Sequence, residues 1–156
     1  MTKLKSTIRA GVFYMRIITC ALLLLVCISD AEAQEKDEWK RLTAFDSATL
    51  DINVSQVTFG TDYTGRVIFR ISLSKAETVP GNKSLKYKRA FQTMEFKCPQ
   101  RQYRIMEVKR FDDKDKLIDT DTADPAAAWK EAKGGSFMDK LLTPACSLIE
   151  EKRRNS

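Results

Sequence analysis

Residues 66–74 read RVIFRISLS, and their pattern is the clearest indication of the fold in the chain. Val67, Phe69, Ile71 and Leu73 share one parity, while the other parity is polar except at Ile68. Successive side chains of a strand point to opposite faces, so this alternation predicts a β-strand with one buried and one solvated face. Strands of that kind are typical of antiparallel sheets.

Further strands of the same sheet are predicted on both sides of this stretch. Turn residues at 60–65 can reverse the chain before it, and the short acidic side chains at 112–115 can close a later hairpin. Residues 75–86 include a Pro-Gly-Asn turn signal and are predicted to form a crossing loop. The run at 103–108 is apolar on parts of both faces, which favours a central position. The predicted strands are 50–54, 57–59, 66–74, 91–98, 103–108 and 116–120.

The two ends of the predicted domain differ in pattern. Near the start, Trp39, Leu42 and Phe45 recur at intervals of three, which fits a helical turn or an irregular strand equally well. Near the end, Ser136 is placed to cap a C-terminal helix with Asp139 three residues on. Pro144 is expected to interrupt or kink this helix. Its inner face is predicted to hold Phe137, Leu141 and Ile149.

Residues 1–33 have the three parts of an export signal in order. A basic leader precedes an apolar run from Ile17 to Ile28, and Ala31-Glu32-Ala33 stands before the predicted cleavage point. The apolar run is shorter than the roughly 20 residues that cross a bilayer, so no integral membrane span is expected after cleavage. Bulky Val26 precedes Cys27, and lipid anchoring at Cys27 is therefore not expected. Met15 is an alternative start that leaves the same mature chain.

The remaining residues have the size of one ordinary domain. We predict a flexible lead-in at 34–38, an α+β domain at 39–150 and a charged tail at 151–156. Acidic residues are interspersed with basic ones through most of this region, so its small positive net charge is best explained by an effect on solubility. Nucleic-acid binders concentrate their basic charge on one surface with motif support, and nucleic acid is not an expected partner.

Two cysteines, Cys98 and Cys146, follow the leader. In an oxidising compartment, two cysteines in one domain most simply form one intramolecular disulfide. A redox site usually has a Cys-x-x-Cys motif or a thiol beside an activating base, and neither is present. We therefore predict a structural bond that ties the terminal helix to the sheet.

The residue types of most active sites are missing. The chain has no histidine, so its commonest proton shuttle and the usual base for a serine or cysteine nucleophile are absent. A hydrolase that uses carboxylates remains an alternative, but the acidic residues at 112–124 lie in a turn and its exit. Their spacing also fails the calcium-loop pattern, because Leu117 and Ile118 fall where a ligand and a glycine are needed. No catalytic residue, metal or cofactor is predicted.

A group of cations between residues 83 and 110 is the remaining candidate site. If the segments on either side of residue 98 pair in the sheet, several cations share one face, which would attract an acidic polysaccharide, anionic lipid headgroups or an acidic protein segment. The alternative is a solvated sheet face whose edge lysines discourage aggregation. The predicted binding residues are Lys86, Lys88, Arg89, Arg101 and Arg104.

The order of several short landmarks resembles the surface-adhesin protein E-like family of small exported bacterial proteins. The landmarks are Trp39, Leu50-Asp51, Gly65, Glu95-Phe96-Lys97-Cys98, Arg104, Phe111-Asp112, Trp129, Gly135-Ser136 and Cys146. The resemblance implies an antiparallel sheet braced by a C-terminal helix, with a disulfide at Cys98 and Cys146. It also implies adhesion to host surface proteins and, by analogy with some members, a homodimer. Lys133-Gly134 stands where the family often has proline, and no contact motif can be transferred.

Together these observations predict an α+β domain in which a single antiparallel β-sheet of five or six strands is packed by a C-terminal α-helix and carries one disulfide. The predicted function is that of a non-enzymatic exported domain, periplasmic or secreted, that binds a protein or an acidic polysaccharide. The alternative is a periplasmic accessory or stress protein that binds a small apolar ligand or an envelope partner.

Overall fold

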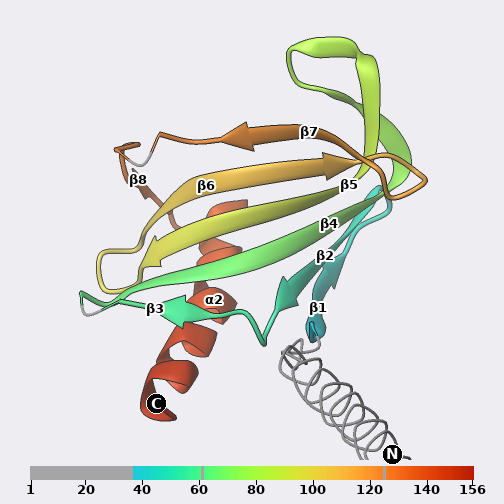
Figure 1. The fold of residues 1–156 in the computed structure, drawn as a ribbon. Helices are drawn as coiled ribbons and strands as arrows, with labels where there is room; N and C mark the ends of the chain where they lie inside the picture. The colour runs from blue at the N-terminus through green and yellow to red at the C-terminus, as the bar shows by residue number, and fades with distance from the viewer. Residues whose placement is uncertain (1–36, 61, 125) are drawn as a thin grey trace, which may run out of the picture. The chain divides into compact units, whose positions relative to one another are not determined.

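The computed structural model describes residues 37–60, 62–124 and 126–156, and the predicted signal at 1–33 lies outside them. Its described part is one antiparallel sheet and one helix, which confirms the predicted fold class. The strand order is β1-β2-β4-β5-β6-β7, while β3 pairs with β4 and β8 with β6 (Figure 1). The elements are β1 (Trp39–Ala44), β2 (Ala48–Asn53), β3 (Thr58–Phe59), β4 (Thr64–Val79), β5 (Asn82–Lys97), β6 (Gln102–Phe111), β7 (Leu117–Thr122), β8 (Lys130–Glu131) and α2 (Phe137–Arg154).

The described sheet has eight strands rather than five or six. Trp39–Ala44, whose pattern left helix and strand open, is a strand paired with β2 through an irregular register. Lys130–Glu131 adds a strand of two residues, too short to leave an alternating pattern in the sequence.

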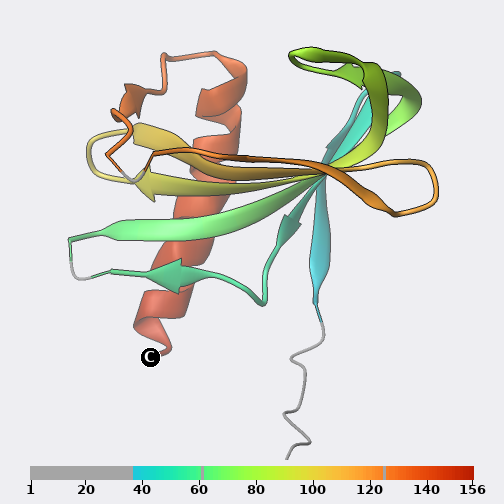
Figure 2. The same ribbon diagram turned by 45° about the horizontal axis from the view of Figure 1, so that its top comes forward.

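The predicted crossing loop at 75–86 is wrong, because most of this segment continues β4 and β5 as a hairpin. We call residues 75–86 the arm; it stands away from the rest of the sheet (Figures 1 and 2). Pro80 and Gly81 occupy the turn between Val79 and Asn82, and Gly81 has a positive φ of 80°. Proline followed by a residue of positive φ suits a tight turn. A register shift between the Ser72 and Glu77 pairs lets the arm leave the plane of the sheet.

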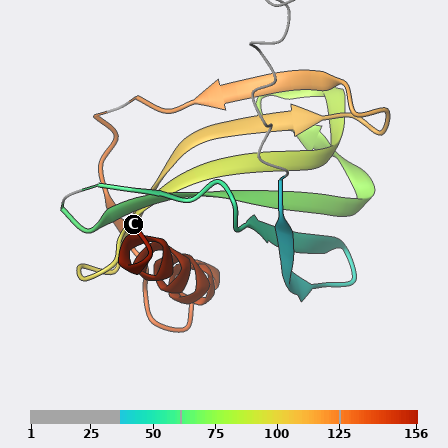
Figure 3. The same ribbon diagram turned by 60° about the horizontal axis from the view of Figure 1, so that its bottom comes forward.

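One face of the sheet packs against α2 and forms the core. Figure 3 shows α2 crossing one end of the sheet. Gly65 lies where α2 packs tightly on the sheet, because a Cβ atom built there would lie 2.3 Å from Cδ1 of Ile149. The buried residues of this core include Leu50, Ile52, Val67, Phe69, Met94 and Phe96 from the sheet and Leu141, Leu142, Ala145 and Ile149 from α2.

The predicted helix start is confirmed. The Ser136 hydroxyl accepts a hydrogen bond from the Asp139 amide at 3.2 Å, and the Asp139 carboxylate accepts one from the Gly135 amide at 2.8 Å. Phe137 does not lie on the inner face as expected, since it is 49% exposed and instead contacts the exposed Phe45. It is the first helical residue and projects beyond the edge of the core.

Pro144 does not end the helix, which runs to Arg154. Proline removes one backbone donor from the ladder, but buried residues both before and after it hold α2 to the sheet. The helix therefore includes four of the six residues that were assigned to a charged tail.

The described part of the predicted lead-in is attached to β2. The carboxylate of Asp37 accepts a hydrogen bond from the Asn53 side chain at 3.1 Å, and the carbonyl of Glu38 accepts one from the Val54 amide at 2.9 Å. The predicted hairpin at 112–115 is confirmed. There the Asp112 carboxylate accepts from the amides of Lys114 and Lys116, each at 2.9 Å.

Candidate binding surface on the open face of the sheet

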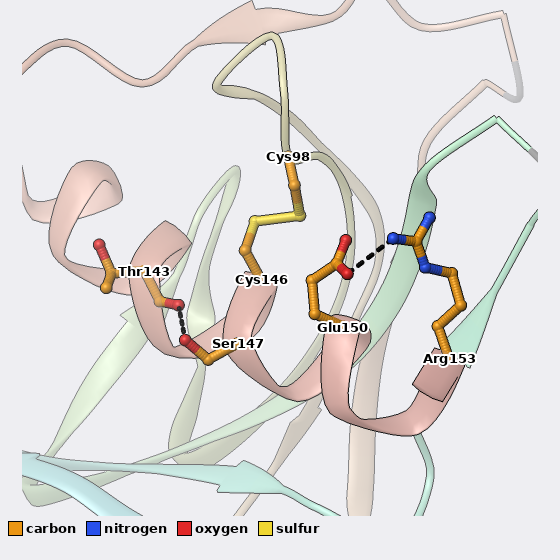
Figure 4. Close-up of a disulfide and its surroundings, with 6 residues drawn as sticks. All are labelled: Cys98, Thr143, Cys146, Ser147, Glu150 and Arg153. Atoms are coloured by element: carbon orange, nitrogen blue, oxygen red, sulfur yellow. Dashed lines mark hydrogen bonds and ion pairs between the residues drawn. A yellow bond between two sulfur atoms is a disulfide. The ribbon is translucent and has the colours of Figure 1, made fainter. Parts of the chain in front are cut away.

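The disulfide places α2 on one face of the sheet. Cys98 follows the end of β5, Cys146 lies in the middle of α2, and their sulfur atoms are bonded with the Cα atoms 5.7 Å apart (Figure 4). Around this point α2 is regular, with the Ser147 hydroxyl donating to the Thr143 carbonyl and Arg153 paired with Glu150. The predicted Cys98–Cys146 bond is confirmed, and no other described helix covers the opposite face of the sheet.

Strand register determines which side chains reach this opposite face, which we call the open face. Directly paired residues of antiparallel strands project on the same side. Arg41, Asp51, Arg70, Phe91 and Lys109 form one row of paired residues across the sheet. Arg66, Glu95 and Arg104 form a second row, and their positions alternate along the strands with the core residues.

Three aromatic rings lie in sequence on the open face. The Trp39 and Phe91 ring centroids are 5.6 Å apart, and those of Phe91 and Phe111 are 5.3 Å apart, both in edge-to-face geometry. The Arg70 guanidinium lies 4.5 Å from the Trp39 centroid. Edge-to-face and cation–π contacts of this kind orient the rings and reduce their freedom before any partner binds.

Each buried carboxylate of the open face is shared by two arginines. Asp51 is 3% exposed and pairs with Arg41 and with Arg70, the latter at 3.0 Å. Glu95 is 8% exposed and pairs with Arg66 at 2.7 Å and with Arg104 at 2.6 Å. A buried charge persists only when it is paired and hydrogen-bonded, and both carboxylates meet this condition.

The Glu95 carboxylate is ionised at neutral pH. Burial by itself raises the pKa of this group. The hydrogen bonds from Arg66 and Arg104 and the charges of both arginines lower the pKa by a larger amount. The result is a Glu95 pKa below its ordinary value. The arrangement therefore keeps two guanidinium groups fixed around one carboxylate, with a net positive charge.

Trp129, on the connection from β7 to β8, extends the open face beside this second row. Its ring centroid lies 4.5 Å from the Lys97 ammonium and 4.6 Å from the Arg104 guanidinium. A shallow groove of about 490 Å³ runs between Trp129, the second row and β3. The lining of this groove includes Phe59, Asp62, Arg66, Glu95, Lys97, Arg104 and Trp129.

The predicted basic residues are distributed over several parts of the structure. Arg89 and Arg104 reach the open face, where Arg89 pairs with Asp115 and Arg104 with Glu95. Arg101 lies in the turn after β5 and pairs with Asp139 of α2. Lys86 and Lys88 lie in the first half of β5. Lys86 is the last residue of the arm, and Lys88 follows two residues later.

Five residues of the open face were not among the binding residues predicted from the sequence: Trp39, Arg66, Arg70, Glu95 and Trp129. A local signal existed for Glu95, which stands between two apolar residues of β5 and so projects opposite to them. Its pairing with Arg66 and Arg104 depends on strand register, which the local pattern does not contain.

Three of the acidic residues at 112–124 have structural roles. Asp112 closes the hairpin turn, Asp115 pairs with Arg89, and Asp119 pairs with Arg110. Nowhere in the described residues do three or more potential metal-ligating side chains gather into a group that could hold a metal ion. Over the same residues, α2 lacks the length of apolar sequence needed to cross a bilayer.

Comparison with protein families agrees with the landmarks of the sequence. The family model described as surface-adhesin protein E matches residues 37–147. The chain belongs to the surface-adhesin protein E family. Membership identifies an exported or surface protein with an adhesin-like role and points away from an enzyme. No curated protein and no solved structure matches the chain significantly.

Proposed function

We propose that this member of the surface-adhesin protein E family binds acidic segments of extracellular proteins through the open face of its sheet. The observation that carries the proposal is the concentration of tryptophan, phenylalanine and arginine side chains on a face that α2 does not cover. Tryptophan and arginine are the residue types that dominate binding energy at protein interfaces.

The charge of the open face favours an acidic partner. Four arginines surround two buried carboxylates, Asp51 and Glu95, and Lys97 adds a further cation beside Trp129. Such an excess steers acidic segments toward the face and speeds association.

The order already present in the face lowers the cost of binding. Arg70 is held by Asp51 and the Trp39 ring, and Arg104 is held by Glu95 and the Trp129 ring. Side chains fixed in advance lose little conformational freedom when a partner arrives. This supports a recognition role for these arginines in addition to a structural one.

The proposal includes the route to the partner. The sequence at 1–33 has the order of parts of an export signal. We propose that it directs the domain out of the cytoplasm. In the oxidising environment outside, the Cys98–Cys146 bond persists.

Surface plasmon resonance with immobilised, purified extracellular matrix proteins tests the function. Arg66 is the best site for a variant, because its side chain is half exposed and Arg104 still pairs with Glu95 when it is removed. Arg66→Gln is expected to weaken capture about tenfold, because a residue that matters at an interface contributes more than about 1 kcal/mol to binding. Lys140→Gln removes the same charge from the exposed surface of α2 and is expected to leave capture unchanged.

Equal losses in the two variants would refute the role of the open face, since they would show a dependence on total charge alone. Direct binding of immobilised heparin, without capture by any matrix protein, would replace the protein partner with an acidic polysaccharide.

A further inference from the structure

The face of the sheet that holds α2 also contains a separate hollow of about 440 Å³. None of its lining residues belongs to α2, which crosses the other end of this face (Figures 1 and 3). Its apolar lining comes from β4, β5, β6 and the connection from β7 to β8. These residues are Ile71, Ala90, Ile105, Val108, Ala123, Ala127 and Ala128.

Gln92 contributes an uncharged polar group to the lining of the hollow. It pairs in register with Phe69 on one side and Val108 on the other, so its side chain projects on the same face as the core. Among the described residues, its carboxamide has no hydrogen-bond partner, although the residue is only partly exposed. A carboxamide offers two donors and one acceptor, so Gln92 retains its full capacity for a ligand.

The charged lining residues of the hollow include cations of β6 and β8. Arg110 and Lys130 contribute two positive charges, and Asp121 contributes one negative charge. Arg104 also lines the hollow, but its guanidinium pairs with Glu95 on the open face. Arg110 is anchored by Asp119 and lies 5.8 Å from the centroid of Tyr87, which also lines the hollow. The Tyr87 hydroxyl donates a hydrogen bond to the Glu77 carboxylate of the arm at 3.2 Å, which orients the Tyr87 ring at the edge of the hollow.

We propose that the hollow binds a small amphipathic carboxylate, with an apolar chain or ring against Ile105 and Val108 and a carboxylate toward the cations. Small-ligand sites combine a mainly apolar concave lining with a few polar groups that fix orientation, and their volumes start near 300 Å³. The hollow exceeds this volume, and seven of its 13 lining residues are apolar. The hollow lies on the opposite face of the sheet from the open face and shares with it only Arg104, so this binding can be tested separately from the proposed function.

Decanoate is a suitable probe, since it joins one apolar chain to one carboxylate. Isothermal titration calorimetry of the folded domain gives its affinity, and amide chemical-shift changes give its location. We expect the largest shifts at Ala90, Gln92, Ile105 and Val108. We also expect 1-decanol to bind at least tenfold more weakly, because it has no charge for the cations.

Two neighbouring alanines supply a matched pair of variants. Ala126 and Ala128 are both exposed on the same connection, but only Ala128 lines the hollow. Ala128→Trp is expected to fill the hollow and weaken decanoate binding at least tenfold, while Ala126→Trp leaves it unchanged. Gln92→Leu is expected to weaken binding about fivefold, the effect of one lost hydrogen bond.

Thermal unfolding of each variant shows whether it keeps the fold. Equal affinity for decanoate in folded Ala126→Trp and Ala128→Trp would overturn the site. Equal affinity for decanoate and 1-decanol would overturn the carboxylate assignment, and the absence of heat and shift changes at millimolar decanoate would overturn the proposal as a whole.

Discussion

Gly65 is the point at which a single methyl group is predicted to disturb the contact between sheet and helix. A Cβ atom there would lie 2.3, 2.4 and 2.6 Å from three side-chain carbons of Ile149. Carbon atoms in contact are normally 3.5–4.0 Å apart, so Gly65→Ala requires Ile149 or the backbone to move by more than about 1 Å. Overpacking of this kind costs about 1–3 kcal/mol. For a domain of this size that corresponds to a fall in melting temperature of roughly 4–12 °C.

Urea unfolding followed by circular dichroism measures this loss directly. Gly134→Ala is the matched control, because no atom lies within 4 Å of the added methyl group, and we expect a change below about 0.5 kcal/mol. The decisive comparison adds Gly65→Ala to an Ile149→Ala background. Ile149→Ala alone should cost about 2–5 kcal/mol.

In that background the second substitution should cost nothing, or should stabilise by up to about 1 kcal/mol, because alanine restricts the unfolded chain more than glycine does. The difference between the two backgrounds is the interaction energy of the methyl group with Ile149. A cost for Gly65→Ala that is the same in both backgrounds would refute the reasoning, since the cause would then lie in the backbone and not in the contact with α2.

Three further predictions concern the disulfide, Glu95 and the helix cap. The Cys98–Cys146 bond closes a loop with a sequence separation of 48. Cys98→Ala, Cys146→Ala and the double variant should therefore each lower the free energy of unfolding by about 4 kcal/mol, as measured by calorimetry. Additive losses in the double variant would contradict a single shared bond. The Glu95 pKa is lowered in the folded state, so the stabilisation from its ion pairs is present above the unfolded pKa of about 4.3 and is lost as pH falls through the folded pKa. Glu95→Gln should therefore cost about 2 kcal/mol at pH 7 and much less at pH 2, as measured by urea unfolding, and a difference that did not change with pH would count against the ion pairs as its source. Ser136→Ala removes the acceptor for the Asp139 amide and should cost about 1 kcal/mol in thermal unfolding, whereas Ser147→Ala, on the exposed side of α2, should cost less than half of that.

Much of the fold was predictable because its signals are local. The alternation at 66–74 reports which side of one strand is buried, and the side chain of Asp112 bonds to the backbone of its own turn. The cap at Ser136 likewise involves residues only three positions apart. In each case the residues that determine the structure are adjacent in the sequence.

The errors of prediction arise where a distant contact overrides a local preference. Polar residues and a Pro-Gly turn at 75–86 indicate a loop, but pairing between β4 and β5 extends into this segment. Pro144 is a helix breaker by local rules, yet the contacts of Ala145, Cys146 and Ile149 with the sheet and the disulfide hold the helix on both sides of it. Tertiary contacts of this kind outweigh propensities of about 3 kcal/mol or less.

From the amino-acid sequence alone we predicted the antiparallel sheet with its terminal helix and the pairing of the two cysteines, which the structure confirms. The export signal at 1–33 stays a prediction. Each of these inferences uses composition or neighbours along the chain. Which side chains share a face depends on the folded arrangement of the strands. Strand register brings Arg66 and Arg104 to Glu95, and the position of α2 leaves this face open while it leaves a hollow on the other. Register is set by pairing between distant segments, so the residues of a binding face on a sheet become neighbours only when the chain has folded.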